Sequence, residues 1–378
     1  MKKLRVMTVL GTRPEIIRLS RVIPALDRDL EQILVHTGQN QDYEMNQIFF
    51  EDLDIRKPDY FLAAAAVTAC ETVGQIVSRT DALLRREPVD AMLVLGDTNS
   101  CLAAYAAKRH RVPVFHMEAG NRCFDERVPE EVNRRIVDHL ADINMPYSDI
   151  SREHLLTEAI PPDRVIKTGS PMFEVIQHYL PKIEASNILS RLKLKKYGYF
   201  LVSAHREENI ESPARFKDLV GILNGLARDH RKDVVFSTHP RTRKKIEAES
   251  PALSKRIRLC KPFAFTDYVH LETNAIAVLS DSGTITEESN ILNFPALNIR
   301  EAHERPEGIE EGSVILAGMD YGNVQRGLAV LASQPRGQDR LIRIVSDYQA
   351  PNVSEKVLRI ILSYTDYVNR SVWHKRSN

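Results

Sequence analysis

The chain has 378 residues, of which 43% are hydrophobic, so it can bury two cores, because single domains rarely grow beyond about 250 to 300 residues. Its 52 basic and 51 acidic residues leave a formal net charge of +1, which excludes a global field that would attract nucleic acid or an anionic membrane. No signal peptide or membrane-spanning window is recognisable, so we expect a cytoplasmic protein with no nucleic-acid or membrane partner.

Short β-branched runs alternate with amphipathic stretches, which is typical of βα units that build a parallel sheet. A helix is expected over Arg13–Leu26, with Thr12 as its cap and Pro14 at its start. The strands expected in the first half are Leu4–Leu10, Gln32–His36, Ala91–Leu95, Pro113–Met117 and Ile143–Met145.

The same rhythm restarts after a helix and a Lys-rich crossover that follow Ile166. The expected strands are Tyr199–Ser203, Val234–Ser237, Ile257–Leu259, Ile276–Leu279, Ala296–Ile299 and Val314–Leu316. Apolar residues recur at helical spacing over Ser354–Val372. We therefore expect an α/β protein with two Rossmann-like domains that face a cleft, divided into residues 1–170, residues 171–353 and a C-terminal helix in residues 354–378 that packs back on the first domain.

Nearly every unusual polar cluster directly follows an expected strand. The clusters are GTRPE, TGQN, GDTNS and EAGNR in the first half, and SAHREEN, THPRT, SDSGTITEES and REAHERPE in the second. The carboxyl ends of parallel strands line the ligand crevice of α/β sheets, so both domains are expected to contribute to one cleft.

SDSGTITEES indicates an anion site, because Ser282, Gly283 and Thr284 lie where a strand turns into a helix with free backbone N–H groups. Glu287 and Glu288 are expected in the first helical turn, where a carboxylate can accept hydrogen bonds from a ribose diol. An ordinary helix start with acids that complement the helix dipole explains the same pattern. Three further groups suit a diphosphate, although each also suits a surface salt bridge: Arg13, His205 and Arg206.

Four acids of the first half suit proton transfer. Asp97 and Glu118 each follow a buried strand, and Glu130 and Glu131 open the PEEVNRR segment, so a general base and a general acid can face one substrate. Asp97 is equally compatible with an N-cap and Glu130 with an ordinary helix start, and both alternatives stay open. His36 and His116 are interpreted as satisfied core or rim histidines.

Several chemistries lack their usual signals. The four cysteines are widely separated, and the motifs of dinucleotide-dependent oxidoreductases, P-loop enzymes, serine hydrolases and zincins are missing. We expect no metal and no cofactor.

The motifs GTRPE, GDTNS, EAGNR, PEEVNR, SAHREEN, SDSGTITEES and ERPE together resemble the non-hydrolysing UDP-N-acetylglucosamine 2-epimerase family, in order and spacing, over almost the whole chain. The resemblance implies a glycosyltransferase-B fold, a UDP-sugar substrate and a homodimer. It implies catalytic roles for Asp97, Glu118, Glu130 and His205. It implies substrate-binding roles for Arg13, Arg18, Arg134, Tyr268, Ser282, Gly283 and Glu288.

The departures from the family pattern concern the sugar side. Arg18 stands where typical members have lysine, EAGNRC where they have EAGLRT, and Asn40 where the histidine of a regulatory site is found. These features resemble the branch that acts on 6-deoxy sugars, which implies epimerisation of a UDP-2-acetamido-2,6-dideoxy-L-hexose from L-talo to L-fuco for capsule or O-antigen synthesis. The alternatives are a UDP-N-acetylglucosamine 2-epimerase, a glycosyltransferase of the same fold and a catalytically inactive sugar-nucleotide sensor.

Overall fold

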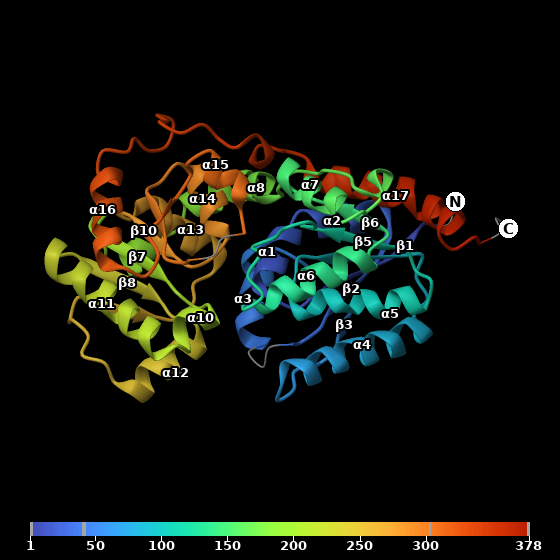
Figure 1. The fold of residues 1–378 in the computed structure, drawn as a ribbon, viewed down its shortest axis with the longest axis horizontal. Coiled ribbons are helices and arrows are strands. Elements are labelled where there is room, and N and C mark those ends of the chain that lie inside the picture. Colours follow the sequence, from blue (N-terminus) through green and yellow to red (C-terminus); the bar gives the residue numbers. More distant parts are fainter. Residues whose placement is uncertain (1–2, 40–42, 302–303, 376–378) are drawn as a thin grey trace. The chain divides into compact units, whose positions relative to one another are not determined.

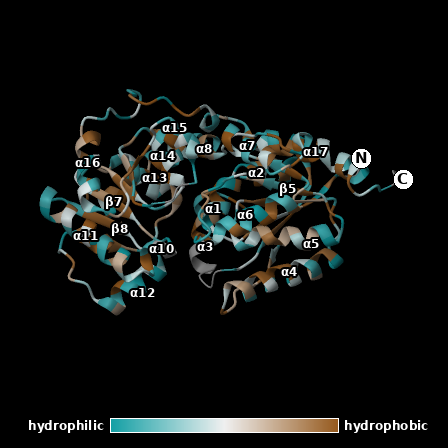
Figure 2. Cartoon of the chain, in the orientation of Figure 1, coloured by the Kyte–Doolittle hydropathy of each residue, from teal (hydrophilic) through white to brown (hydrophobic). Residues whose placement is uncertain are grey.

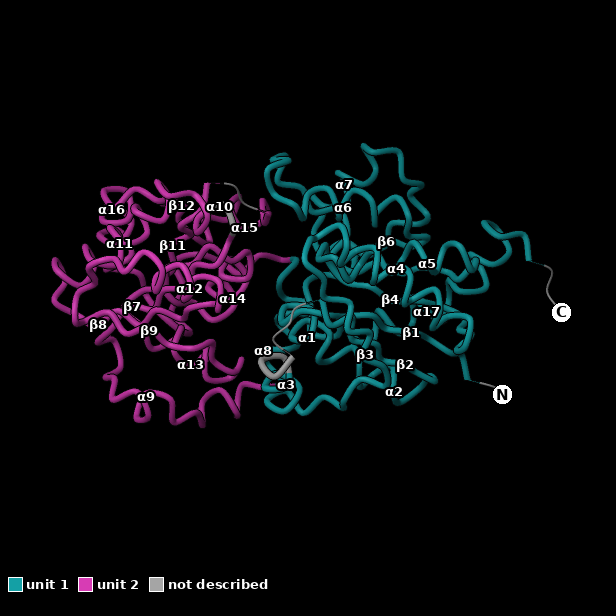
Figure 3. The backbone as a smooth tube through the Cα atoms, turned by 90° about the horizontal axis from the view of Figure 1, so that it is seen from below, with its two compact units in different colours: residues 1–178, 347–378 teal, residues 179–346 magenta. Residues whose placement is uncertain are grey.

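The computed structural model describes residues 3–39, 43–301 and 304–375. The chain forms two compact units, of which unit 1 comprises residues 1–178 and 347–378 and unit 2 comprises residues 179–346 (Figure 3). Each unit holds one six-stranded sheet in which all paired strands are parallel. The prediction of an α/β protein with two Rossmann-like domains is confirmed.

The sheet of unit 1 has the order β3-β2-β1-β4-β5-β6, and the helices of this unit lie on its two faces (Figure 1). Its strands are β1 (Arg5–Leu10), β2 (Glu31–His36), β3 (Tyr60–Phe61), β4 (Ala91–Leu95), β5 (Val114–Met117) and β6 (Ile143–Met145). The strand order reverses between β1 and β4, and open α/β sheets bind ligands beside such a reversal, at the carboxyl ends of the strands.

The helices of unit 1 connect these strands and cover the sheet. They are α1 (Arg13–Leu19), α2 (Val22–Asp29), α3 (Tyr43–Asp52), α4 (Ala69–Arg86), α5 (Ala103–Arg109), α6 (Pro129–Leu140), α7 (Asp149–Thr157) and α17 (Val353–Ser371), with a short 3₁₀ turn at Asn99–Leu102. Helix α8 (Met172–Glu184) carries the chain into unit 2, and α17 packs on α2.

The expected single helix over Arg13–Leu26 is wrong, because the structure divides it into α1 and α2. Pro24 lacks an N–H group, so it is tolerated in the first turn of a helix but breaks the hydrogen bonding of a helix interior. The break after Leu19 places Pro24 in the first turn of α2.

Unit 2 repeats the topology of unit 1, with the sheet order β12-β11-β10-β7-β8-β9. Its strands are β7 (Tyr199–Ser203), β8 (Asp233–Ser237), β9 (Ile257–Cys260), β10 (Val278–Ser280), β11 (Ala296–Asn298) and β12 (Ile315–Leu316). Its helices are α9 (Ile188–Arg191), α10 (Glu207–Ile210), α11 (Pro213–His230), α12 (Pro240–Glu249), α13 (Phe265–Asn274), α14 (Thr284–Leu292), α15 (Pro306–Glu310) and α16 (Tyr321–Leu331). The order reverses between β7 and β10.

Burial of the central strands explains why they could be predicted from apolar runs in the sequence. All five residues of Ala91–Leu95 are buried, because helices cover both faces of a parallel sheet. Figure 2 shows the hydrophobic colouring of strands such as β8. Each buried valine or leucine contributes on the order of 1.5–3 kcal/mol. Strand β3, with only Tyr60 and Phe61, is too short to produce such a run and was not predicted.

Candidate active site

Two acids of unit 1 follow neighbouring strands. In the β4–β5 pair Leu95 lies opposite Met117, so Asp97 and Glu118 both emerge at the carboxyl edge of the sheet. The Gly96 N–H donates to the carbonyl of Met117 at 3.0 Å, which ties the two strand ends together. The structure thus brings together two of the predicted catalytic acids.

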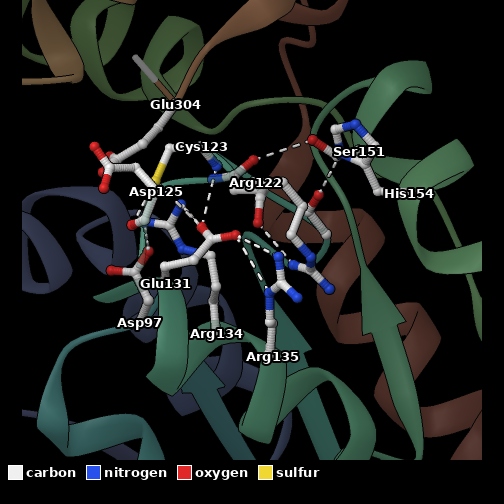
Figure 4. Close-up of polar contacts among 12 residues, drawn as sticks. Asp97, Arg122, Cys123, Asp125, Glu131, Arg134, Arg135, Ser151, His154 and Glu304 are labelled. Atoms are coloured by element: carbon white, nitrogen blue, oxygen red, sulfur yellow. Dashed lines mark hydrogen bonds and ion pairs between the residues drawn. The ribbon is translucent and has the colours of Figure 1, made fainter. Parts of the chain in front are cut away.

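Asp97 is paired with Arg134 from helix α6. Its carboxylate lies 2.7 Å from Nη2 of Arg134, whose side chain is only 2% exposed (Figure 4). Asn133, on the same helix, donates to the backbone carbonyl of Asp97 at 3.0 Å. Helix α6 therefore holds both the backbone and the charge of Asp97, and the N-cap of the following 3₁₀ turn is Thr98, whose hydroxyl accepts the Ser100 N–H at 3.3 Å.

Glu118 is paired with Arg18 from helix α1. The Oε2 atom of Glu118 lies 3.4 Å from Nε of Arg18, and the Arg18 guanidinium lies over the ring of Tyr147, 5.5 Å from its centroid. Glu118 has a φ of +65°, in the left-handed region that side chains other than glycine seldom adopt. Such strain costs on the order of 1–3 kcal/mol and persists where the surroundings over-determine the backbone, as at active sites.

Two further predicted site residues of unit 1, Glu130 and Arg13, lie at the starts of the helices that carry Arg134 and Arg18. Glu130 is half-buried in the first turn of α6, directly after Pro129. Arg13 is half-buried at the start of α1, with its guanidinium carbon 5.8 Å from the ring centroid of Phe49.

The most buried acid of α6 is Glu131, which the sequence places with Glu130 among the carboxylates at the start of PEEVNRR but to which it gives no catalytic role. It accepts hydrogen bonds from the Cys123 backbone at 3.0 Å and from Arg134 and Arg135 at 3.1 Å (Figure 4). Burial raises the pKa of Glu131, but the Cys123 hydrogen bonds and the two arginines outweigh it, so the pKa lies below its usual value. The spacing of Glu131 to Arg134 and Arg135, three and four residues on, was the available signal.

Glu15, the last residue of GTRPE, is an acid to which the sequence analysis gave no role. Its carboxylate accepts hydrogen bonds from the backbone N–H groups of Gly11 at 2.8 Å and Thr12 at 2.7 Å, and from the Thr98 hydroxyl at 2.9 Å. Burial raises the pKa of Glu15 to about 7 against the effect of these hydrogen bonds. Glu15 therefore joins the turn after β1 to the turn that carries Asp97. The capping-box pattern of Thr12 and Glu15 was the signal.

A fully buried ionic cluster supports the same edge. His116 contacts Asp138 at 2.9 Å and the carbonyl of Gly96 at 2.8 Å, and Arg122 pairs with Asp138 at 2.7 Å. Burial lowers the pKa of His116, but the Asp138 carboxylate outweighs it and the pKa is raised. His116 is thus a hydrogen-bonded core histidine, as interpreted from the sequence. It contacts Gly96, the residue directly before Asp97.

In unit 2, Asp281 organises the turn that follows β7. Its Oδ2 atom accepts hydrogen bonds from the backbone N–H groups of His205 and Arg206, both at 2.9 Å, and Oδ1 lies 3.2 Å from Nδ1 of His205. Burial raises the pKa of Asp281, but His205 and Arg206 outweigh it and hold the pKa well below its usual range. Asp281 belongs to the SDSGT motif but was not singled out.

The predicted phosphate turn lies where β10 leads into α14. The Ser282 N–H donates to Oγ of Ser280 at 3.1 Å, and the Ser282 hydroxyl lies 3.0 Å from that of Thr284. Gly283 is the N-cap residue of α14, and a Cβ there would lie 3.5 Å from Oε2 of Glu304. The first turn of a helix is suited to an anion, and here the Ser282 and Thr284 N–H groups also donate to the Ser280 and Ser282 hydroxyls.

The expected placement of Glu288 in the first turn of α14 is wrong, because the helix begins only at Thr284 and just Glu287 lies in that turn. Glu288 lies buried further along the helix and contacts Glu272 of α13. Burial and the neighbouring Glu288 raise the pKa of Glu272 well above its usual value. Tyr268, also on α13, is partly buried against the core of unit 2.

The described residues show neither a metal cluster nor a membrane-spanning helix. No cluster of three or more histidine, cysteine or acidic side chains among them has an arrangement that could hold a metal ion, and none of their helices is long and apolar enough to cross a membrane. Asn40, the departure at the regulatory motif, lies outside the described residues.

Comparison with known proteins identifies the family. The family model described as UDP-N-acetylglucosamine 2-epimerase matches residues 24–362. The UDP-N-acetylglucosamine 2-epimerase structure from Rickettsia bellii superposes with a TM-score of 0.91 at 48% identity, over 99% of this chain and 100% of that one.

Two further relatives are more distant. The Methanocaldococcus jannaschii enzyme, in complex with UDP-GlcNAc and UDP, has a TM-score of 0.89 at 30% identity, over 95% of this chain and all of that one. A UDP-2,3-diacetamido-2,3-dideoxy-D-glucuronate 2-epimerase from Pseudomonas aeruginosa is 32% identical over 83% of this chain and 88% of its own. The chain therefore belongs to the UDP-N-acetylglucosamine 2-epimerase family and is an isomerase, a UDP-sugar 2-epimerase.

Proposed function

We propose that the chain inverts C2 of a UDP-2-acetamido-2,6-dideoxy-L-hexose, from the L-talo to the L-fuco configuration, in the synthesis of a capsule or O-antigen precursor. The observation that carries the reaction type is the pair of acids on neighbouring strand ends, Asp97 beside Arg134 and Glu118 beside Arg18. Two acids of this kind can serve as base and acid on opposite faces of one carbon.

The chemistry explains why acids and a phosphate site are needed together. The C2 hydrogen of such a sugar is not next to a carbonyl carbon, so deprotonation alone is too costly. When a carboxylate removes this proton as the C1–O bond breaks, UDP leaves and a 2-acetamidoglycal forms. Protonation of C2 from the other face and return of UDP to C1 complete the inversion. Holding UDP in place keeps its return effectively intramolecular.

We assign the UDP moiety to residues that suit a leaving phosphate. Ser282 contributes its hydroxyl and Gly283 its backbone N–H at the start of α14, and Asp281 orients the backbone and ring of His205. Groups arranged in this way stabilise negative charge as it develops on the leaving oxygen. On the same proposal Arg13 binds the phosphates, Glu288 binds the ribose and Tyr268 lies beside the uracil.

The choice of sugar rests on what surrounds Glu118. Arg18 lies 3.4 Å from its Oε2 atom and Asn121 lies 3.3 Å from its Oε1 atom, and both positions differ from typical UDP-N-acetylglucosamine members. The Pseudomonas aeruginosa relative is named for a different UDP-sugar at 32% identity, so identity at this level is compatible with a change of sugar.

The second candidate substrate is UDP-N-acetylglucosamine. It is favoured by the names of the Rickettsia bellii and Methanocaldococcus jannaschii proteins, the first of which is 48% identical to this chain.

One experiment separates the two substrates and tests the reaction. The protein is incubated in D₂O with each nucleotide separately, and products are followed by NMR. We expect inversion and deuterium at C2 of the 6-deoxy-L-talo nucleotide, with slower or no turnover of UDP-N-acetylglucosamine. Faster turnover of UDP-N-acetylglucosamine would reverse the choice of sugar, and rapid inversion without exchange would contradict the elimination mechanism.

We also propose a homodimer, which is supported by apolar side chains on the neighbouring helices α5 and α6. Tyr105 and Val132 are each 50% exposed and Ile136 is 44% exposed. Light scattering should give twice the mass of the chain, and Val132→Glu should lower it. A monomeric parent protein would contradict the proposal.

A further inference from the structure

The turn after β5 is pressed against the first turn of α7. Gly120 has a φ of +81°, and a Cβ there would lie only 2.2 Å from the backbone oxygen of Ser151. No other residue fits without moving the helix, because the atom that a Cβ would meet is a backbone oxygen and the conformation favours glycine. The residues on either side of Gly120 are thereby held at fixed positions relative to α7.

A series of hydrogen bonds between buried polar side chains passes through this contact. The Ser148 hydroxyl donates to Oγ of Ser151 at 3.0 Å, and the Ser151 hydroxyl donates to Oδ1 of Asn121 at 3.0 Å. The Asn121 amide nitrogen then donates to Oε1 of Glu118 at 3.3 Å. The first three side chains belong to residues that are at most 3% exposed, so water does not replace these partners.

The donor and acceptor of each hydrogen bond in this series follow from Ser148. The Ser148 hydroxyl oxygen caps α7 by accepting the Ser151 N–H at 3.1 Å, so its proton is directed to the Ser151 hydroxyl. The Ser151 proton is then directed to Asn121, which places the carbonyl of the Asn121 amide toward α7 and its NH₂ group toward Glu118. An NH₂ group only donates hydrogen bonds, so the Asn121 amide requires the Glu118 carboxylate oxygen as its acceptor.

We infer that Asn121 is a positioning residue for Glu118, and that Ser151 acts through it by fixing the orientation of its amide. The inference rests on the proposed function, in which Glu118 transfers a proton at C2. Glu118 has one oxygen beside Arg18 and the other beside Asn121, so its carboxylate plane is defined from two sides. The 3.3 Å hydrogen bond is long, and such contacts at catalytic groups commonly tighten when the substrate is bound.

The positioning role explains how a strained residue is kept in one orientation. Glu118 has left-handed backbone geometry, so its side chain projects from the backbone in an unusual direction. A misplacement of about 1 Å at a reacting group can cost on the order of a hundredfold in rate. Asn121 and Ser151 contribute to the rate only through the carboxylate that they orient, and they leave the UDP site unchanged.

The test compares four variants with the parent protein. Asn121→Leu removes the amide at similar size, Asn121→Asp replaces the donor by an acid facing Glu118, and Ser151→Ala removes the hydroxyl that orients the amide. Thr365→Ala is the matched control, since it deletes a buried hydroxyl that donates to the Ile361 carbonyl in α17. For each protein kcat, KM, the rate of C2 deuterium exchange and Tm are measured.

We expect kcat and C2 exchange to fall about tenfold or more in Asn121→Leu, further in Asn121→Asp and less in Ser151→Ala, while KM stays within about twofold. In the Asn121→Leu background Ser151→Ala should add little, because both act through one contact. Thr365→Ala should retain parental kcat. Asn121→Leu with kcat within twofold of the parent, or a kcat loss that follows Tm alone across the four variants, would overturn the inference.

Failure of the inference and failure of the proposed function look different. If the parent protein exchanges C2 and Asn121→Leu exchanges equally fast, the proposed function stands and the positioning role is wrong. If the parent exchanges C2 of neither nucleotide, the proposed function fails and the inference fails with it. If Asn121→Leu does not fold, Asn121→Asp and Ser151→Ala decide by the same criteria.

Discussion

The carboxyl edges of the two sheets use acidic residues in opposite ways. In unit 1 the acids at the strand ends face cations, as Asp97 faces Arg134 and Glu118 faces Arg18. In unit 2 Asp281 binds backbone N–H groups. Asp281 thereby shapes the loop after β7 and also contacts the His205 ring, whereas Asp97 and Glu118 are held by arginine side chains of helices α6 and α1. On the proposed function, one topology yields a proton-transfer edge in unit 1 and an anion-binding edge in unit 2.

The largest expected effect breaks the proton-transfer edge. Asp97→Asn keeps the size of the side chain but removes its charge, so turnover should fall by about 10²- to 10⁴-fold. The UDP dissociation constant should stay within about threefold, since the phosphate turn belongs to unit 2. NMR turnover and calorimetric UDP titration measure the two effects, with the exposed Asp366→Asn on α17 as control. An Asp97→Asn variant within tenfold of parental turnover would remove this residue from the chemistry.

The next effect breaks the anion-binding edge. Asp281→Asn removes a buried charge that holds two backbone N–H groups and His205, so UDP should bind about tenfold or more weakly and unfolding should need about 2–3 kcal/mol less. The pKa of Asp281 lies below its usual 3.8, so this stabilisation is present at neutral pH and lost as the solution becomes more acidic. Denaturant unfolding and UDP titration provide the measurements. The exposed Asp218→Asn on α11 is the control, and equal UDP affinity in Asp281→Asn and the parent would contradict the assignment.

A third prediction sharpens the contrast inside unit 1, because the partners of Glu15 among the described residues are the hydrogen-bond donors Gly11, Thr12 and Thr98 instead of a cation. Its pKa is raised from 4.5 to about 7, so its folded state favours the protonated form. The contribution to stability is present below about pH 4.5 and is lost as the pH rises through 7, a change on the order of 3 kcal/mol.

Glu15→Gln removes this titration while retaining an acceptor for Gly11 and Thr12. Unfolding free energies from pH 4.5 to 8 should therefore decline more in the parent than in Glu15→Gln. Parallel curves for the two proteins would show that Glu15 does not titrate in this range.

The smallest effect concerns Cys123, whose thiol contacts Glu131 at 3.3 Å. Burial raises the pKa of Cys123 to about 11, so the thiolate needed for alkylation is scarce at neutral pH. Iodoacetamide should modify Cys123 more slowly than the exposed Cys70, and Cys123→Ser should retain turnover within about twofold. Mass spectrometry of a time course follows both cysteines. Faster modification of Cys123 than of Cys70 would contradict the burial of the Cys123 thiol beside Glu131.

Most of the fold could be predicted because buried parallel strands leave continuous apolar runs in the sequence. The runs around Ala91–Leu95 and Tyr199–Ser203 match β4 and β7 residue for residue. The break between α1 and α2 was missed, since apolar spacing continues across it. Strand β3 was missed because its two residues are recognised only by their pairing with β2.

The sequence by itself determined the chemistry that is available at each strand end, because motifs such as GDTNS and EAGNR follow apolar strands whose ends share one edge of a sheet. Only the tertiary structure decided which acid meets which partner. Glu131 rather than Glu130 is buried among the arginines of α6, and Glu288 lies against Glu272 instead of in the first turn of α14. Such pairings join residues far apart in the chain or on one turn of a helix, and which side of a helix faces the site depends on packing that no local pattern encodes.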